Sequence, residues 1–449
     1  MGTLDWVIYG LAVAVFACWC FVWHMHIMAI INGEGAGSTE MVLLFYTLYG
    51  FAIFFFGGWC FVWLLHLFAI FNGKLKLHKK CQLPSPEVPL PGVSILKPLT
   101  GVDQNLFTNL ESFFTMNYPK YELLFCIEDE SDPSIMLVKK LVEKHPEIDA
   151  SIFIGASKYP FDKDASIKRA PIVGVNPKIN NMNPGYEAAK YDLILVSDSG
   201  IRMKEDTLLE MVCAMTENIA LVHQMPFTCD RNNFPAVMEK VYFGTSHARI
   251  YLAADLFRIN CPTGMSALMR KKLLDEVGGM KAFGQYLAED FFFAKSFTDR
   301  GWGIRISSQP AWQNSGICEI TNFNNRVSRW AKLRFAMVPY TIVLEPLSEC
   351  MVLGACAAWA LNVLFQWDVF VVYLVHILAW LILDWILLNV IQNNPLPFSK
   401  MDFVVAWTFR EMGAFYHFCA ALFDPKIQWR TRTFYLKWGG LAEEVKTRL

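Results

Sequence analysis

The sequence lacks the cysteine patterns that mark zinc-binding proteins. Its 449 residues include 12 cysteines, but no CxxC…CxxC array and no His/Cys cluster with the spacing of zinc ligands. Several cysteines stand inside apolar runs, where a free thiol behaves as a small apolar side chain. We therefore expect the middle of the chain to lie in a reducing compartment, without a disulfide framework.

Charge is also scarce. Only 18% of the residues are charged and 54% are hydrophobic, whereas soluble domains carry roughly a quarter charged residues. The formal net charge of −1 gives no indication of a nucleic-acid-binding protein. The apolar excess gathers at the two ends of the chain, and the middle has the composition of a soluble domain. This distribution predicts a soluble domain held between membrane segments.

Two apolar runs near the N-terminus, at 6–31 and 42–71, are each long enough to span a bilayer, which takes roughly 20 residues. Neither resembles a cleavable signal peptide, because the basic n-region and the small-residue cleavage site are missing. The string Cys-Phe-Val-Trp at 20–23 recurs at 60–63. We interpret the repeat as a tandem duplication or two joined first exons; a helical hairpin is the alternative.

Basic residues follow the second run. By the positive-inside rule they place this junction, and with it the middle domain, in the cytosol. They are Lys74, Lys76, Lys79 and Lys80.

The C-terminal part contains two further apolar segments, at 351–367 and 369–390. A third segment, at 403–423, includes Arg410 and Glu411, and these charges make it a poor lipid-facing span. We expect it to lie in the membrane interface or to pack inside a helix bundle.

Between residues 92 and 334, short apolar runs alternate with helical stretches. The runs at 92–96, 121–127, 151–154 and 193–196 predict strands. Strands separated by helices indicate an α/β fold with a mostly parallel, doubly wound sheet. Ligands of such sheets bind beyond the carboxyl ends of the strands.

Acidic residues follow two of these predicted strands. Asp129 and Asp132 come after the second strand, and Asp198 comes after a later one. Carboxylates that converge at a sheet edge suit Mg²⁺ or Mn²⁺ together with the hydrogen-bond donors of a nucleotide. The alternative is structural, because an Asp at a strand end commonly caps a helix or forms a turn.

Farther along the chain, Glu289 and Asp290 precede three phenylalanines, and the pentad Arg-Val-Ser-Arg-Trp occupies 326–330. Arg326 and Arg329 are three residues apart and therefore share one helical face. Guanidinium groups in this arrangement can pair with the oxygens of a pyrophosphate. The alternative is an Arg/Trp helix that anchors the domain at the lipid interface.

Together these elements resemble the glycosyltransferases with the D, D, D, (Q/R)xxRW signature, and among them the ceramide glucosyltransferases. The similarity runs from about Leu43 to the C-terminus. The first apolar run has no counterpart in the family, and 158–173 resembles an inserted surface loop. The motifs of the narrower resemblance are Lys-Pro-Leu at 97–99, Asn-Pro-Lys-Ile-Asn-Asn at 176–181, Ser-Asp-Ser-Gly-Ile-Arg at 197–202, Tyr-Phe-Gly-Thr-Ser-His at 242–247, Thr-Gly-Met-Ser at 263–266 and Leu-Ala-Glu-Asp at 287–290.

The resemblance implies a GT-A domain that transfers glucose from UDP-glucose to the primary hydroxyl of ceramide with inversion, assisted by Mg²⁺ or Mn²⁺. It implies Asp290 as the general base, and Arg326, Arg329 and Trp330 at the leaving UDP. The residues it implies at the nucleotide sugar or metal are Asp129, Asp132, Asp198 (also the metal ligand), Lys178 and Asn180. It implies Glu289 and His247 in the vicinity of the acceptor or nucleotide, and a capping role for His247 stays open.

We expect five parts: an extra apolar segment (1–41), a membrane helix with its basic stop (42–80), a cytosolic catalytic domain (92–334), membrane or interfacial helices (335–423) and a basic tail (424–449). The resemblance implies a multi-pass Golgi membrane protein and leaves a homo-oligomer open. A polysaccharide synthase or polyprenyl-phosphate sugar transferase of the same fold is the rival. An inactive scaffold is disfavoured because the acidic and arginine positions are all present. A transporter is disfavoured because the longest coherent unit is the soluble α/β domain.

Overall fold

The computed structural model describes residues 36–80, 89–159, 172–231, 233–316, 318–429 and 432–445. The first apolar run and most of the inserted loop lie outside these residues. The proposed duplication therefore stays a prediction.

A mixed eight-stranded sheet forms the centre of the α/β domain, in the order β10-β7-β9-β5-β1-β2-β3-β4. Strand β1 is parallel to both β2 and β5, whereas β9 is antiparallel to β5 and β7. The four predicted strands correspond to β1, β2, β3 and β5. The strands are β1 (Val93–Leu99), β2 (Tyr121–Ile127), β3 (Ala150–Ile154), β4 (Ser157–Tyr159), β5 (Leu193–Ser197), β7 (Ile219–His223), β9 (Ser266–Arg270) and β10 (Gly303–Ile306).

Helices cover both faces of this sheet, so its central strands are apolar at nearly every position. Strand β2 illustrates the alternation: Leu123 and Phe125 face one core, and Leu124 and Cys126 face the other. The first core takes residues from α3 (Leu106–Phe114), α4 (Ser134–Lys144) and α6 (Thr207–Ala214), and the second from α5 (Pro177–Ala188), α9 (Lys271–Asp275), η2 (Met280–Phe283) and α10 (Glu289–Thr298).

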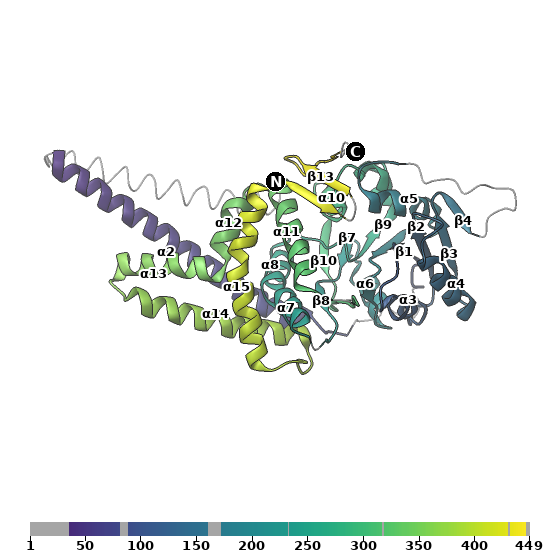
Figure 1. Cartoon of the computed structure of the whole chain (residues 1–449), viewed down its shortest axis with the longest axis horizontal. Coiled ribbons are helices and arrows are strands. Elements are labelled where there is room, and N and C mark those ends of the chain that lie inside the picture. The colour runs from purple at the N-terminus through teal and green to yellow at the C-terminus, as the bar shows by residue number, and fades with distance from the viewer. Residues whose placement is uncertain are drawn as a thin grey trace.

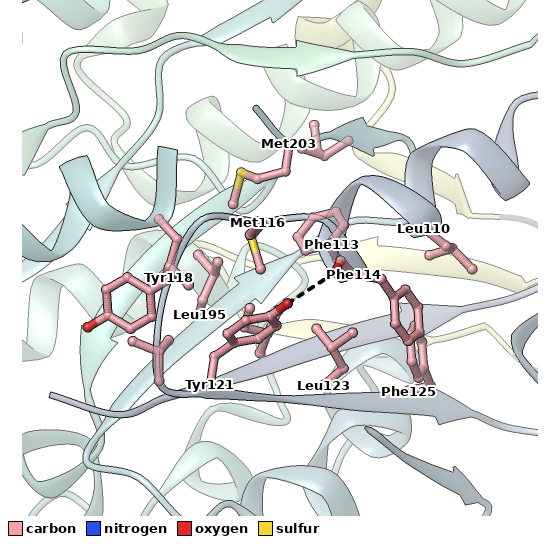
Figure 2. Packing of buried hydrophobic residues seen from close by; sticks show 14 of the residues in the cluster. Leu110, Phe113, Phe114, Met116, Tyr118, Tyr121, Leu123, Phe125, Leu195 and Met203 are labelled. Carbon is pink, nitrogen blue, oxygen red and sulfur yellow. Dashed lines mark hydrogen bonds between the residues drawn. The ribbon is translucent and has the colours of Figure 1, made fainter. Parts of the chain in front are cut away.

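Figure 2 shows the first core, where Phe113 and Phe114 of α3 pack over the strands. The hydroxyl of Tyr121 donates to the carbonyl oxygen of Phe114 at 3.4 Å, which joins the start of β2 to the end of α3.

Among the described residues, two helices are long and apolar enough to cross a membrane. They are α2 (Ala36–Lys76), over Met41–Lys76, and α14 (Val369–Gln392). A third span arises if α12 (Thr341–Ser348) and α13 (Cys350–Phe365), which bend by 80° at their junction, count as one. Figure 1 shows α2, α13 and α14 at the end of the molecule opposite the sheet, with α8 (Ala248–Phe257) and α11 (Ile320–Met337) between them.

The charged segment at 403–423 forms most of α15 (Lys400–Phe423). Arg410 and Glu411 are buried, whereas Met412 and Tyr416 on the same helix are exposed. A cluster of polar side chains explains how these charges are buried. Asp384 of α14 is 0% exposed, and its carboxylate lies 3.0 Å from Arg410, 3.4 Å from Arg249 of α8 and 3.2 Å from His66 of α2. One carboxylate therefore joins four helices.

Arg410 also contacts Thr245 in a π-helical turn, η1 (Phe243–His247). This turn links α7 (Phe234–Tyr242) to α8. The Asp384 cluster thereby connects the apolar helices to the segment that carries His247.

Two small sheets complete the fold. One combines β6 (Ile201–Arg202), β11 (Ala311–Gln313) and β8 (Pro226–Thr228); the other combines β12 (Lys426–Trp429), β13 (Arg432–Leu436) and β14 (Ala442–Glu444). The second lies in the segment predicted only as a basic tail. It forms a sheet because Ile427, Phe434 and Leu436 pack against Leu333 of α11.

One cysteine departs from the free thiols that a domain without a disulfide framework would contain. Cys213 is disulfide-bonded, whereas eight other cysteines of the described ranges are free. A single bridge leaves no regular spacing in the sequence, so composition alone did not reveal it.

Candidate active site

A cavity of about 1630 Å³ lies beyond the carboxyl ends of the central strands and continues along the apolar helices. It brings together eight predicted site residues from four elements and from the loop after β5. They are Lys178, Asp198, His247, Glu289, Asp290, Arg326, Arg329 and Trp330.

Lys178 organises the acidic side of the cavity. Its ammonium lies 2.9 Å from Asp198 and 3.0 Å from Glu289, and it donates to the carbonyl oxygen of Gly264 at 3.2 Å. Burial alone would lower the pKa of Lys178, but the two carboxylates outweigh burial and raise it well above its ordinary value. Lys178 is therefore a fixed positive charge between two acids.

Local structure explains why Lys178 points there. Asn176 caps α5, and its side-chain oxygen accepts from the N–H groups of Lys178 and Ile179 at 2.8 and 3.3 Å. The amide nitrogen of Asn176 donates to the second oxygen of Glu289 at 3.0 Å. One helix cap thus fixes both the lysine and one of its partners.

Asp290 stands in the first turn of α10, where its carboxylate accepts from the N–H of Phe291 at 2.9 Å. Burial and the neighbouring Glu289 raise the pKa of Asp290 to about 6, although Lys178 and the Phe291 N–H favour the charged form. A Cβ atom at Gly264 would lie 3.0 Å from Asp290, so glycine leaves room for this carboxylate. A carboxylate with this pKa is suited to accept a proton near neutral pH.

The two arginines of the pentad have different surroundings. Arg326 forms a 2.5 Å salt bridge with Glu239 of α7, and Glu239 also pairs with Arg231 at 2.7 Å. The guanidinium of Arg329 lies over the ring of Trp429 at 5.6 Å. Within the described part of the chain Arg329 has no salt bridge, so its charge is available to an anionic ligand.

Trp330 packs against aromatic side chains in the cavity wall. Its ring stacks on His247 with centroids 5.6 Å apart and planes 19° apart, and it contacts Phe243 at 5.9 Å. Burial, with help from Arg334 and Arg326, lowers the pKa of His247 to about 3, so this imidazole is neutral at physiological pH. These contacts place the pentad in the cavity wall.

Three predicted residues do not line the cavity: Asp129, Asp132 and Asn180. The carboxylate of Asp132 accepts from the N–H groups of Gly101 and Ser134, both at 2.8 Å. Asp129 accepts from the N–H of its neighbour Ser131 at 2.9 Å.

The side-chain oxygen of Asn180 accepts from the N–H groups of Val173 and Gly174 at 3.0 and 3.2 Å. All three side chains therefore bind backbone N–H groups nearby. For Asp129 and Asp132 this matches the structural alternative for acidic residues at strand ends.

The sequence reasoning missed one cavity residue, Asp103, and one residue that pairs with a cavity residue, Glu239. Asp103 lines the cavity just beyond β1 and accepts from the N–H of Gly316 at 2.9 Å. It could have been found by the rule that selected Asp198, because it too follows the carboxyl end of a strand. Glu239, the partner of Arg326, lies in α7, and the apolar pattern of this helix did not indicate a functional residue.

A buried lysine binds the backbone of Asp198. Lys97 in β1 is fully buried and donates to the backbone oxygen of Asp198 at 2.7 Å, with Phe113 3.8 Å away. Burial lowers the pKa of Lys97 to about 7, and Asp198 opposes this shift. The Lys97 bond fixes the end of β5, which carries Asp198.

Comparison with known proteins identifies the family. Residues 61–442 match the family described as Glycosyl transferase family 21. The chain belongs to this family. The predicted fold class, an α/β GT-A domain with flanking apolar helices, is confirmed.

The chain is similar to several ceramide glucosyltransferases. It is 46% identical over 369 residues to ceramide glucosyltransferase 3 of Caenorhabditis elegans, covering 82% of this chain and 77% of that protein. For ceramide glucosyltransferase 1 of the same organism the identity is 43%, covering 83% and 76%. The ceramide glucosyltransferase of Komagataella phaffii is 26% identical, covering 82% and 87%.

Among solved structures, a mannosyltransferase from Pyrobaculum calidifontis in complex with GDP-Man and Mn²⁺ aligns with a TM-score of 0.45. The two chains are 15% identical, and the alignment covers 84% of this chain and 98% of that one.

Proposed function

We propose that this membrane protein transfers glucose from UDP-glucose to the primary hydroxyl of ceramide, giving glucosylceramide and UDP with inversion at the anomeric carbon. The observation that carries the proposal is the single cavity in which Asp290 and the pentad arginines meet the wall of the apolar helices. Membership of family 21 and the similarity to three ceramide glucosyltransferases support the choice of donor and acceptor.

In this proposal Asp198, Lys178 and Asp103 hold the nucleotide sugar. Lys178 is a buried, permanent cation, and Asp198 and Asp103 follow the neighbouring parallel strands β5 and β1. Lysine binds phosphate as a point charge, so Lys178 is placed to hold the donor phosphates.

A divalent cation fits this site through Asp198. Mg²⁺ is commonly held by one or two carboxylates together with substrate phosphates, and the side chain of Asp198 is 41% exposed. No group of three or more His, Cys, Asp or Glu side chains suited to a metal occurs in the described residues, so phosphate oxygens would complete the coordination. Bound there, Mg²⁺ or Mn²⁺ would neutralise pyrophosphate charge.

Asp290 acts as the general base in this proposal. It takes the proton of the ceramide hydroxyl while that oxygen forms a bond to the anomeric carbon. The bond from the anomeric carbon to the UDP oxygen breaks in the same step, and its electron pair leaves with UDP. Attack opposite to the leaving group inverts the configuration without a covalent enzyme intermediate.

Arg329 and Arg326 stabilise the departing UDP. Arg329 is the better placed to pair with phosphate because it has no salt bridge within the described ranges, and Arg326 is held in the wall by Glu239. Trp330 and the neutral His247 form the aromatic wall beside them.

The membrane arrangement follows from the charges at the end of α2. Lys74 and Lys76 occupy its last turn, and by the positive-inside rule this end faces the cytosol. We propose a multi-pass Golgi membrane protein whose catalytic domain, 92–334, is cytosolic and lies between the membrane segments at 42–80 and 335–423.

The test uses membranes that contain the full-length protein. They are given a fluorescent ceramide and, separately, UDP-glucose, UDP-galactose or UDP-N-acetylglucosamine. We expect a new fluorescent glycolipid with UDP-glucose, identified as the β-linked product by enzymatic digestion, and little product with the other donors. Preference for another donor, or transfer to a polyprenyl phosphate but not to ceramide, would contradict the proposal.

Glu239→Gln should lower kcat/KM about 10- to 100-fold. The substitution removes a charged partner worth about 1.5–3 kcal/mol from Arg326, and about 1.4 kcal/mol corresponds to a tenfold change in rate. Initial-rate kinetics with both substrates measure the effect. Glu111→Gln is the control, because it removes a carboxylate from a surface pair with Lys144. Equal losses in the two variants would rule out a specific role for Glu239.

A further inference from the structure

The cavity has more room than a nucleotide sugar needs. Its volume is about 1630 Å³, whereas sites for single small ligands measure about 300–1,000 Å³. The excess lies away from the charged residues, along α2 and the bent pair α12–α13. We call this part the apolar arm and define it by Ile53, Gly57, Gly58, Phe61, Leu344 and Leu353, all of which line the cavity.

We propose that the apolar arm holds one hydrocarbon chain of the acceptor lipid and that Gly57 and Gly58 keep it open. This inference rests on the proposed function, because it assumes that the acceptor is a lipid whose hydroxyl reacts beside Asp290.

The distribution of polarity in the cavity supports this occupant. One end carries Asp290, Arg326 and Arg329. Between Ile53 and Leu65 the helix α2 contains no charged residue, and eight of its residues in this stretch line the cavity. A cavity with a charged end and an apolar end fits an amphiphile that has a hydroxyl head and a hydrocarbon tail.

The length of the arm also fits. Ile53 and Leu65 are separated by twelve residues, which at the helical rise of about 1.5 Å per residue span roughly 18 Å. One half of a bilayer's hydrocarbon region is about 15 Å thick. The arm thus extends over about the depth that a lipid chain occupies in one leaflet.

The two glycines have an unusual environment for a membrane helix. Small residues normally let neighbouring helices approach closely. A Cβ atom at Gly57 or Gly58, however, would meet no atom of the described residues within 4 Å, whereas at Gly73 of the same helix it would lie 3.2 Å from Leu252 and Val390. Gly57 and Gly58 therefore preserve open space, and larger side chains there would fill the arm.

The bend between α12 and α13 explains why the space exists. The two helices meet at 80°. Leu344 of α12 and Leu353 of α13 both line the cavity. Phe61 is 42% exposed, so the arm reaches the outer surface of α2.

The kinetic test compares acceptors that differ only in chain length. Full-length Gly58→Phe and Gly57→Phe are assayed with ceramides of natural length and with ceramides truncated in the N-acyl chain or in the sphingoid base. We expect at least a tenfold loss of kcat/KM for the long acceptor, near-normal turnover of one truncated acceptor, and an unchanged KM for UDP-glucose. Leu64→Phe is the matched control, because Leu64 is 49% exposed on the same helix and lies outside the cavity.

A binding measurement makes the inference independent of turnover. A ceramide with a photoreactive diazirine in one chain, tested in each chain in turn, should cross-link to 53–65 in the original protein and much less in Gly58→Phe. Equal losses for all acceptors, no loss for any, or cross-linking outside the arm would overturn the inference. Cross-linking in the arm without glucosyl transfer would instead refute the proposed function and leave the binding site standing.

Discussion

Asp290→Asn is expected to reduce kcat for glucosyl transfer about 10²- to 10⁴-fold, the usual contribution of a positioned general base. An alcohol is a weak nucleophile at neutral pH, and asparagine cannot take its proton. The amide has nearly the shape of the carboxylate and can still accept from the N–H of Phe291, so the fold and the KM for UDP-glucose should be retained. Steady-state kinetics with UDP-glucose and ceramide measure the loss.

Asp149→Asn is the control for this change, because Asp149 belongs to an exposed pair with Lys190. Turnover by Asp290→Asn within threefold of the original protein would remove Asp290 as the base. Loss of UDP-glucose binding in that variant would instead show that Asp290 serves the donor.

The pH profile gives a second measure of the same residue. Burial and Glu289 raise the pKa of Asp290 to about 6, and only the deprotonated form can accept the proton. The rate should therefore be constant above this pH and fall about tenfold per pH unit below it. The residual rate of Asp290→Asn should lack this limb; a limb that persists unchanged would belong to another group.

Asp384→Asn is expected to destabilise the protein by about 3–5 kcal/mol, the range for removing one partner of a buried charge cluster. The carboxylate is 0% exposed and lies against two guanidinium groups, Arg249 and Arg410. Without it these two positive charges remain buried with less compensation. Thermal unfolding of the purified protein in lipid nanodiscs measures the effect as a lower midpoint.

Asp368→Asn serves as the control in the same helix. Asp368 caps α14 by accepting from the N–H of Val371, and asparagine is an equally good cap, so little change is expected. If the Asp384→Asn protein is as stable as this control, other partners must compensate the buried charges of Arg249 and Arg410. Glu411, which contacts Arg410, would then be the residue to replace next.

The sequence predicted those parts of the fold that a local pattern determines. The four strands of the first half appeared as apolar runs because both faces of the sheet are covered, as β2 shows with Leu123 and Leu124 in opposite cores. Arg326 and Arg329 were recognised as a pair because a spacing of three residues brings side chains to one helical face.

Contacts between distant segments could not be predicted in this way. Glu239 reaches Arg326 from another helix, and Asp384 meets Arg249 from a segment far along the chain. The position of a residue after a strand was also not enough to identify the residues that line the cavity. Asp132 and Asp198 both follow strands, yet the carboxylate of Asp132 binds backbone N–H groups of a turn while Asp198 faces the cavity.

The ammonium of Lys178, held between Asp198 and Glu289, has a consequence for the cycle of donor entry and product exit. Because this cation belongs to the protein, the acidic side of the site is largely compensated before the donor arrives and after UDP leaves. Charge-stabilising groups that are fixed in advance need little reorganisation when charge develops. The vacant site should therefore keep the arrangement of the loaded one, and each turnover can begin without rebuilding it.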